Sequence, residues 1–206
     1  MLWAVAGLAA LIYWVLSLRP GHQWARTAVK GLAVLPLVPM ALTHGAPLVA
    51  LALFLCSLGD MVLSRPGERA FLGGLVAFAL GHLGWIAVFV TLGVSAAPFA
   101  IFWPLLATLA VLISVMIRLL LPRAGQLRGP VAAYIAVIAA MSVMAIATDN
   151  HRIIAGAVLF ALSDTLLGMQ TFVLTGGSPA ERIANALIWP LYWTAIALMT
   201  VGALTV

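Results

Sequence analysis

Residues 46–64 read APLVALALFLCSLGDMVLS, an apolar run of membrane-spanning length that carries one carboxylate, Asp60, near its end. A helix needs roughly 20 apolar residues to cross the hydrocarbon core of a bilayer. A segment this apolar is expected to be helical in lipid, because lipid cannot hydrogen-bond a free backbone. The stretch therefore predicts a transmembrane helix, and Asp60 is the residue in it that needs an explanation.

The rest of the chain has the same character. Of its 206 residues, 65% are hydrophobic and only 7% are charged, against about 25% charged residues in a typical soluble domain. The mean hydropathy is +1.21. The composition predicts an integral membrane protein with one domain over residues 1–206 and no room for a separate soluble domain. We expect it in the bacterial inner (cytoplasmic) membrane.

Polar and turn residues divide the sequence into eight apolar segments, which predicts an all-α protein with eight transmembrane helices. Pro36 and Pro39 are expected to kink the second segment. The N-terminus has no basic region ahead of its apolar run and no clear cleavage site, so we expect it to be a retained first span. The predicted spans are 2–18, 29–43, 46–64, 70–92, 98–121, 129–148, 152–175 and 183–205.

The basic residues alternate between the two sides of this arrangement. The loops that follow odd-numbered spans, with the adjoining helix ends, carry nine of them, whereas the opposite loops carry only Arg152. The positive-inside rule then places the basic loops in the cytoplasm and both termini outside. Because these residues are scattered singly, the net charge of +5 indicates orientation in a lipid bilayer rather than a nucleic-acid partner. The nine are Arg19, Arg26, Lys30, Arg65, Arg69, Arg118, Arg123, Arg128 and Arg182.

A second intramembrane carboxylate is found at residues 159–168, LFALSDTLLG, around Asp164. The segments SLGDMVL and ALSDTLL align on their aspartates, and they lie four spans apart. Two helices in that relation run in the same direction, as in a 4+4 duplication of the kind some transporters have. We therefore expect a possible 4+4 pseudo-repeat. The oligomeric state is left open by the sequence.

Asp60, Asp164 and His82 are the candidate catalytic residues. On the predicted topology all three lie in the inner half of the membrane or near its midplane. A carboxylate at that depth is costly unless it is paired or neutralised. The alternatives are that Asp60 is a helix-end residue paired with Arg65 or Lys30, and that His82 makes an interhelical hydrogen bond.

Four more polar residues lie in the same predicted region. Lys30 either snorkels to the interface or binds a lipid phosphate. Tyr134, Asn185 and Tyr192 either form hydrogen bonds between helices or line a cavity open to the inner leaflet. Asn185 and Tyr192 are seven residues apart, so they share one face of the last helix.

Two carboxylates in a site of low dielectric can differ in protonation, one acting as an acid and the other as a base. Addition of water across a polarised bond is natural work for such a pair. The sequence has no GxSxG or HExxH motif, and we expect no cofactor and no metal. A metal held by Asp60, Asp164 and His82 is a weaker alternative. Rival readings are a proton-coupled transporter or a lipid-binding membrane protein that uses the same two aspartates.

At these residues the sequence resembles the YhhN family of lysoplasmalogenase-like membrane proteins. The resemblance covers nearly the whole chain and is best in SLGDMVL, GLVAFALGHLGWIAVF, GPVAAYIAVIAAM and GAVLFALSDTLLG. The chain departs from the family pattern at Gly31, Trp85 and Ile196, where the family often has Pro, Tyr and Gln. The residues that match the family motifs are Lys30, Gly59, Asp60, His82, Tyr134, Ser163, Asp164 and Tyr192.

The resemblance implies hydrolysis of the vinyl ether bond of a lysoplasmalogen or a related lysophospholipid. Asp164, the deeper and less compensated carboxylate, is expected to be the acid. Asp60 would be its ionised partner, and His82 would orient one of them or relay a proton. Lys30 and Tyr134 are candidates for binding the head-group phosphate. The full set of expected substrate-binding residues is Lys30, Tyr134, Ser163, Asn185 and Tyr192.

Overall fold

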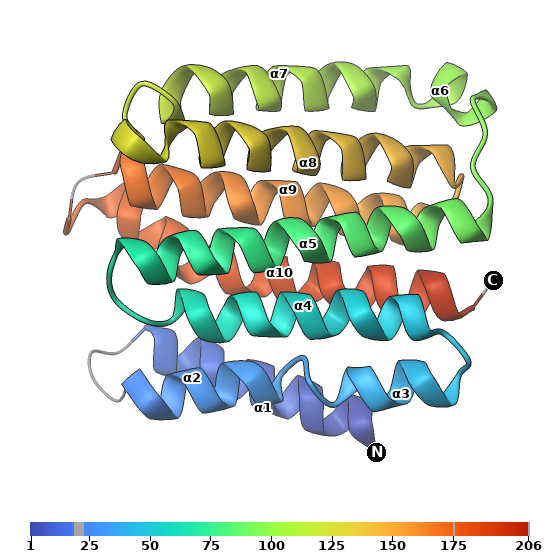
Figure 1. Ribbon diagram of the computed structural model, residues 1–206, viewed down its shortest axis with the longest axis horizontal. Helices are drawn as coiled ribbons and strands as arrows, with labels where there is room; N and C mark the ends of the chain where they lie inside the picture. Colours follow the sequence, from blue (N-terminus) through green and yellow to red (C-terminus); the bar gives the residue numbers. More distant parts are fainter. Residues whose placement is uncertain (19–22, 175, 206) are drawn as a thin grey trace. The chain divides into compact units, whose positions relative to one another are not determined.

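The computed structural model describes residues 1–18, 23–174 and 176–205, and no strand occurs among them. The prediction of an all-helical protein is confirmed (Figure 1). The helices are α1 (Leu2–Ser17), α2 (Gln23–Leu32), α3 (Leu37–Thr43), α4 (Pro47–Leu63), α5 (Glu68–Leu92), α6 (Ala97–Ile101), α7 (Trp103–Leu120), the 3-10 turn η1 (Gly125–Leu127), α8 (Arg128–Ala147), α9 (His151–Phe172) and α10 (Pro179–Leu204).

Within the described residues, six helical segments are long and apolar enough to cross a membrane, which makes this a multi-pass membrane protein. Two shorter apolar helices are α1, with 16 residues, and α4, with 17. The count of eight spans and the 4+4 repeat stay predictions. Arg19, one of the nine basic residues in the orientation argument, lies outside the described residues. The six segments are Trp24–Thr43, Glu68–Leu92, Trp103–Leu120, Gly125–Ala147, His151–Phe172 and Pro179–Leu204.

The second predicted span is interrupted between α2 and α3, where Pro36 stands, and Pro39 lies in the first turn of α3. A proline has no N–H for the carbonyl four residues earlier, so Pro36 cannot continue the ladder of α2, whereas Pro39 is tolerated in the first turn of α3 because N–H groups there have no partner within the helix. Residues 33–36 form turns instead, and the N–H of Leu37 donates to the carbonyl of Val34 at 2.9 Å. The expected kink is therefore a hydrogen-bonded turn over residues 33–36, within the segment Trp24–Thr43. Helix α2 also begins at Gln23, six residues before the predicted start at residue 29.

The prediction of one continuous helix over 98–121, the fifth span, was wrong because this segment is divided into two helices. The structure divides it at Phe102 into α6 and α7. Pro104 is the physical cause, because it cannot donate to the carbonyl of Ala100. The N–H of Phe102 donates to Pro98 at 2.9 Å and closes α6.

The chain divides into two compact units, Met1–Trp85 and Ile86–Val206, with the boundary inside α5. In the first unit, α4 packs against α2, α3 and the first part of α5 (Figure 1). Glycines allow the close approach of α4 and α5: a Cβ at Gly59 would lie 2.7 Å from the ring of Phe78, and one at Gly81 would lie 2.8 Å from Cys56 Sγ. The expectation of one domain over residues 1–206 stays a prediction.

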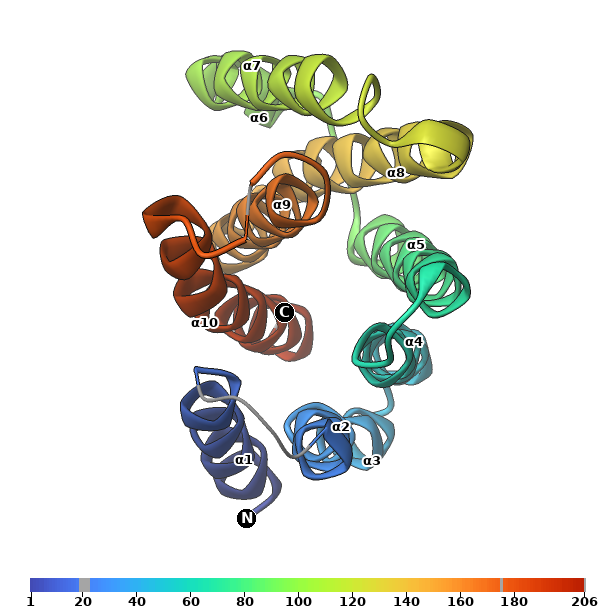
Figure 2. The ribbon, with the colours of Figure 1, turned by 90° about the vertical axis from the view of Figure 1, so that its left-hand side faces the viewer.

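In the second unit, α9 lies between α8 and α10 (Figure 2). Helices α9 and α10 approach so closely at Gly156 that a Cβ there would lie 2.9 Å from the carbonyl oxygen of Ala195. At the start of α9, the side chain of Asn150 accepts from two backbone N–H groups of the first turn, as an N-cap residue does. Its amide also donates to the carbonyl of Gly202 in α10, at 3.2 Å.

Candidate functional site

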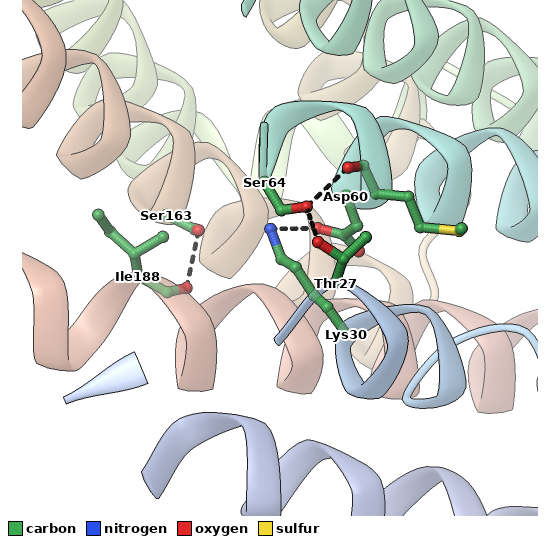
Figure 3. Close-up of polar contacts among 7 residues, drawn as sticks. Thr27, Lys30, Asp60, Ser64, Ser163 and Ile188 are labelled. Atoms are coloured by element: carbon green, nitrogen blue, oxygen red, sulfur yellow. Dashed lines mark hydrogen bonds and ion pairs between the residues drawn. The ribbon is translucent and has the colours of Figure 1, made fainter. Parts of the chain in front are cut away.

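In the first unit, Asp60 is buried on α4 and forms an ion pair with Lys30, which lies in the last turn of α2. Lys30 Nζ lies 2.8 Å from Asp60 Oδ1 (Figure 3). The same ammonium lies 5.7 Å from the centroid of the Tyr13 ring on α1, within the range of a cation–π contact. Of the two cations that the sequence offered to Asp60, the structure therefore selects Lys30. Removing one partner of such a pair would leave a buried charge uncompensated.

Next to this ion pair lies a contact between hydroxyl groups that the sequence reasoning missed. Thr27 Oγ1 and Ser64 Oγ are 2.6 Å apart (Figure 3). Helical spacing is the signal that was available, since Thr27 is three residues before Lys30 and Ser64 is four after Asp60. Tyr13 was missed as well, and no spacing argument links α1 to this pair.

His82 is fully buried on α5, where its Nδ1 lies 2.6 Å from the carbonyl oxygen of Phe78 one turn earlier. A carbonyl only accepts, so Nδ1 carries the proton, and in the neutral ring Nε2 is then an acceptor. This bond holds the imidazole to its own helix. The hydrogen bond at Nδ1 therefore lies within α5 and is not the interhelical bond considered in the sequence analysis.

In the second unit, Asp164 is buried on α9, and the Tyr134 hydroxyl on α8 donates to its Oδ2 at 2.8 Å. Two residues that the sequence analysis placed in the site are thus brought into direct contact. Tyr134 was expected to contact a head-group phosphate, but in this structure its hydroxyl donates a hydrogen bond to the side chain of Asp164. A phenol satisfies part of the carboxylate without adding a charge.

Ser163 precedes Asp164 on α9 and makes a different contact. Its hydroxyl donates to the carbonyl oxygen of Ile188 on α10, at 2.9 Å (Figure 3). Because a serine has one hydroxyl proton, this bond uses it to tie α9 to α10.

The two predicted site residues of α10 differ in their surroundings. Tyr192 is buried, with its ring edge-on to Phe160 at 5.2 Å between centroids and tilted against Trp189 at 5.5 Å. Asn185 is exposed and accepts a hydrogen bond from the side-chain amide of Gln170 on α9. Phe160 lies on α9, one turn before Asp164, whereas Trp189 and Tyr192 lie on α10. The aromatic cluster is therefore linked to Asp164 through Phe160, on the same face of α9.

Across the described ranges 1–18, 23–174 and 176–205, no group of three His, Cys, Asp or Glu side chains is arranged to hold a metal ion. The buried or partly buried polar groups described above are two carboxyl groups, the Lys30 ammonium, hydroxyl groups and the His82 imidazole. Buried carboxylates that keep such partners are frequent at functional sites in membrane proteins.

The fold and these residues define a multi-pass helical membrane protein that buries a carboxylate in each of its two units. The sequence profile of the YhhN family matches residues 2–203, and the chain belongs to that family. Two curated relatives are named lysoplasmalogenase, one from Mycobacterium bovis (strain ATCC BAA-935 / AF2122/97) and one from Mycobacterium tuberculosis (strain CDC 1551 / Oshkosh). Each is 32% identical over 222 aligned positions that cover 97% of this chain and 82% of the relative. No solved structure matches the chain.

Proposed function

We propose that the protein is a membrane-embedded hydrolase that cleaves the vinyl ether bond of lysoplasmalogens, or of a related lysolipid. The products are a fatty aldehyde and a glycerophospho-head group. The two relatives named lysoplasmalogenase support the proposal, and membership of the YhhN family supports it further. The observation that carries it is the pair of buried aspartates, one held by an ammonium and the other by a phenol. The bacterial inner membrane is the proposed location.

The reaction consumes one water molecule and needs only proton transfers. An acid protonates the β-carbon of the vinyl ether, and the electrons of the double bond leave a positive charge shared by the α-carbon and the ether oxygen. A water oxygen then bonds to the α-carbon, and its proton passes to a base. The resulting hemiacetal then collapses: its hydroxyl proton passes to a base as the C=O bond forms, the C–O bond to glycerol breaks, and the acid returns a proton to the glycerol oxygen.

The two carboxylates suit different steps. Asp164 is assigned as the acid, since Tyr134 supplies a hydrogen bond without a positive charge that would hold it ionised. Asp60 is assigned as the anion, because Lys30 stabilises its charged form. An anion of this kind stabilises the cationic intermediate or accepts the proton of water.

The remaining predicted residues take supporting roles in this proposal. His82, with the proton on Nδ1, presents Nε2 as a proton acceptor and relays protons. Ser163, Asn185 and Tyr192 stay proposed substrate contacts.

The decisive experiment measures aldehyde release from a lysoplasmalogen by the purified protein in detergent. We expect turnover by the wild type and a loss of at least about 100-fold in Asp60→Asn and in Asp164→Asn. Asp149→Asn is the matched control, because Asp149 is exposed in the turn before α9 and its positive φ of 55° suits asparagine.

Folded wild-type protein that releases no aldehyde from choline or ethanolamine lysoplasmalogens would contradict the proposed substrate. Movement of an intact lysolipid across vesicle membranes, lost in the same two variants, would instead support a transporter. Equal activity in wild type and Asp164→Asn would remove that residue from the chemistry.

A further inference from the structure

Three side-chain contacts join α2 to α4 and the two residues that follow it, in a regular order. Trp24 meets Arg65, Thr27 meets Ser64, and Lys30 meets Asp60. The residue numbers rise along α2 as they fall along α4, so the two helices are antiparallel here. On α2, Trp24 is 77% exposed, Thr27 5% and the Lys30 side chain 12%, and on α4 Asp60 is 1% exposed. Along the two helices the hydroxyl pair thus lies between the Trp24–Arg65 contact and the ion pair, and Figure 3 shows it next to the ion pair.

The direction of the hydrogen bonds follows from counting protons. Ser64 Oγ donates its one proton to the carbonyl oxygen of Met61, at 2.7 Å. It therefore has no second proton to give, and in the 2.6 Å contact with Thr27 Oγ1 it can only accept. The chain of bonds runs from Thr27 through Ser64 to the backbone of α4, so it ties α2 to a fixed point on α4.

Two further contacts hold α2 in this place. A Cβ at Gly31 would lie 3.3 Å from Met61 Sδ, so α2 and α4 are in close contact beside the ion pair. At the other end of α2, the guanidinium of Arg26 donates to the carbonyl oxygens of Leu16 and Ser17 at the end of α1. The axial position of α2 is thereby defined from both ends.

Lys30 is the only lysine of the chain, and its long side chain has two possible destinations. A lysine at the end of a helix commonly extends its ammonium to the head-group layer. Here the ammonium is on Asp60 instead. Holding the Lys30 side chain in one conformation costs rotamer entropy. The ion pair must offset that cost, and it does so only while the Asp60 carboxylate is held within reach of the ammonium.

We propose that Thr27 and Ser64 are positioning residues whose hydrogen bond keeps the Lys30 ammonium on Asp60 and away from the head-group layer. Lys30 is then the partner of the carboxylate and not the ligand of the substrate phosphate. The consequence for catalysis rests on the proposed hydrolase function, whereas the placement of the ammonium does not.

The placement is tested without any substrate, through the reactivity of the one lysine. An N-hydroxysuccinimide ester acylates amines, and an ammonium held on a buried carboxylate is protected from it. The rate of acylation at Lys30 is followed by mass spectrometry of its peptide, which separates it from the N-terminal amine. We expect a rise of about fivefold or more in Thr27→Val and in Ser64→Ala.

Two controls accompany these variants. Thr27→Ser restores a hydroxyl and is expected to react at the wild-type rate. Thr200→Val removes an equally buried threonine hydroxyl, which donates to Ile196 within α10, and is also expected to leave the rate unchanged. Wild-type acylation rates in folded Thr27→Val and folded Ser64→Ala would overturn the proposal.

Turnover provides the second readout. In Thr27→Val we expect kcat for lysoplasmalogen to fall about tenfold with KM unchanged, and Thr27→Ser to recover it. A rise in KM with kcat unchanged would assign Lys30 to the head group and overturn the proposal. If the wild type releases no aldehyde, the proposed function fails, while the acylation rates still decide the placement of Lys30.

Discussion

The contact between Tyr134 and Asp164 leads to a prediction for a single hydroxyl group. Tyr134→Phe keeps the ring in its place on α8 and removes only the donor to Asp164 Oδ2. A hydrogen bond between a phenol and a protonated carboxyl group contributes about 0.5–1.5 kcal/mol to stability. We expect kcat for aldehyde release to fall about tenfold or more, and the thermal unfolding temperature to fall by only a few degrees.

Steady-state kinetics on lysoplasmalogen would measure this effect. Unchanged kcat in Tyr134→Phe would mean that the phenol only helps to pack α8 against α9. A rise in KM alone would return Tyr134 to the role first expected of it, contact with the head group.

The partner of Asp60 shows what the sequence could predict at the residue scale. Sequence reasoning offered Lys30 and Arg65 as cations and had no means to choose between them. Arg65 lies beyond the end of α4, and its Cζ is 3.5 Å from the centroid of the Trp24 ring. The choice depends on α2 starting at Gln23, which brings Trp24 into a helical turn opposite Arg65. An apolar-run argument misses that start, because the first turns of α2 are polar.

At the scale of the helix, the start of α10 shows the same limitation. The apolar pattern placed it at residue 183, whereas α10 begins at Pro179. The sequence Ser178-Pro-Ala-Glu181 has the spacing of a capping box. Ser178 Oγ indeed accepts from the N–H of Glu181, and Glu181 in turn accepts from the N–H of Gly177. The helix start was readable from cap residues, which hydropathy does not weigh.

The close contact between α9 and α10 leads to a prediction for a helix pair. In Gly156→Ala the new Cβ would lie 2.6 Å from Met199 Cγ and 2.9 Å from the carbonyl oxygen of Ala195. The methionine side chain can move, but the backbone oxygen moves only if the helices separate. Overpacking of this kind costs about 1–3 kcal/mol. We expect a lower thermal unfolding temperature in detergent, followed by circular dichroism.

Gly129→Ala provides the matched control for this change. Gly129 is also helical, near the start of α8, and a Cβ there would have no atom within 4 Å. Alanine is the better helix former by up to about 1 kcal/mol, so this variant should unfold at the wild-type temperature or slightly above it. If Gly156→Ala is as stable as Gly129→Ala, the two helices do not pack as closely as the structure indicates.

For the molecule as a whole, composition was enough to predict an all-helical membrane protein, and prolines mark the places where predicted helices are interrupted. An all-helical membrane protein follows from apolar content alone, because helices satisfy their own backbone in lipid. Pro36 and Pro39 were recognised as interruptions, whereas Pro104 was missed within the apolar run that became α6 and α7. Side-chain contacts between helices, such as that of Tyr134 with Asp164, are not visible in any local sequence pattern.

The number of spans depends on α1 and α4. With 16 and 17 residues, they are about 24 and 26 Å long, somewhat short of a core of about 30 Å. Short helices can still cross, because the bilayer thins locally and flanking residues extend to its surface. Six or eight spans both place the two termini on the same side, so only the loops distinguish the two counts.

Labelling with a membrane-impermeant maleimide would therefore decide the count. Cys56, the one native thiol, is buried and would first be replaced in Cys56→Ala. If α4 crosses, His44→Cys is labelled in intact cells, and Glu68→Cys only after the membrane is opened. If α1 crosses, a cysteine added ahead of Met1 is labelled from outside and Trp24→Cys is not. Labelling of His44→Cys and Glu68→Cys from one side would show that α4 does not span. Labelling of Glu68→Cys from outside, with His44→Cys protected, would instead reverse the orientation that the arginines predict.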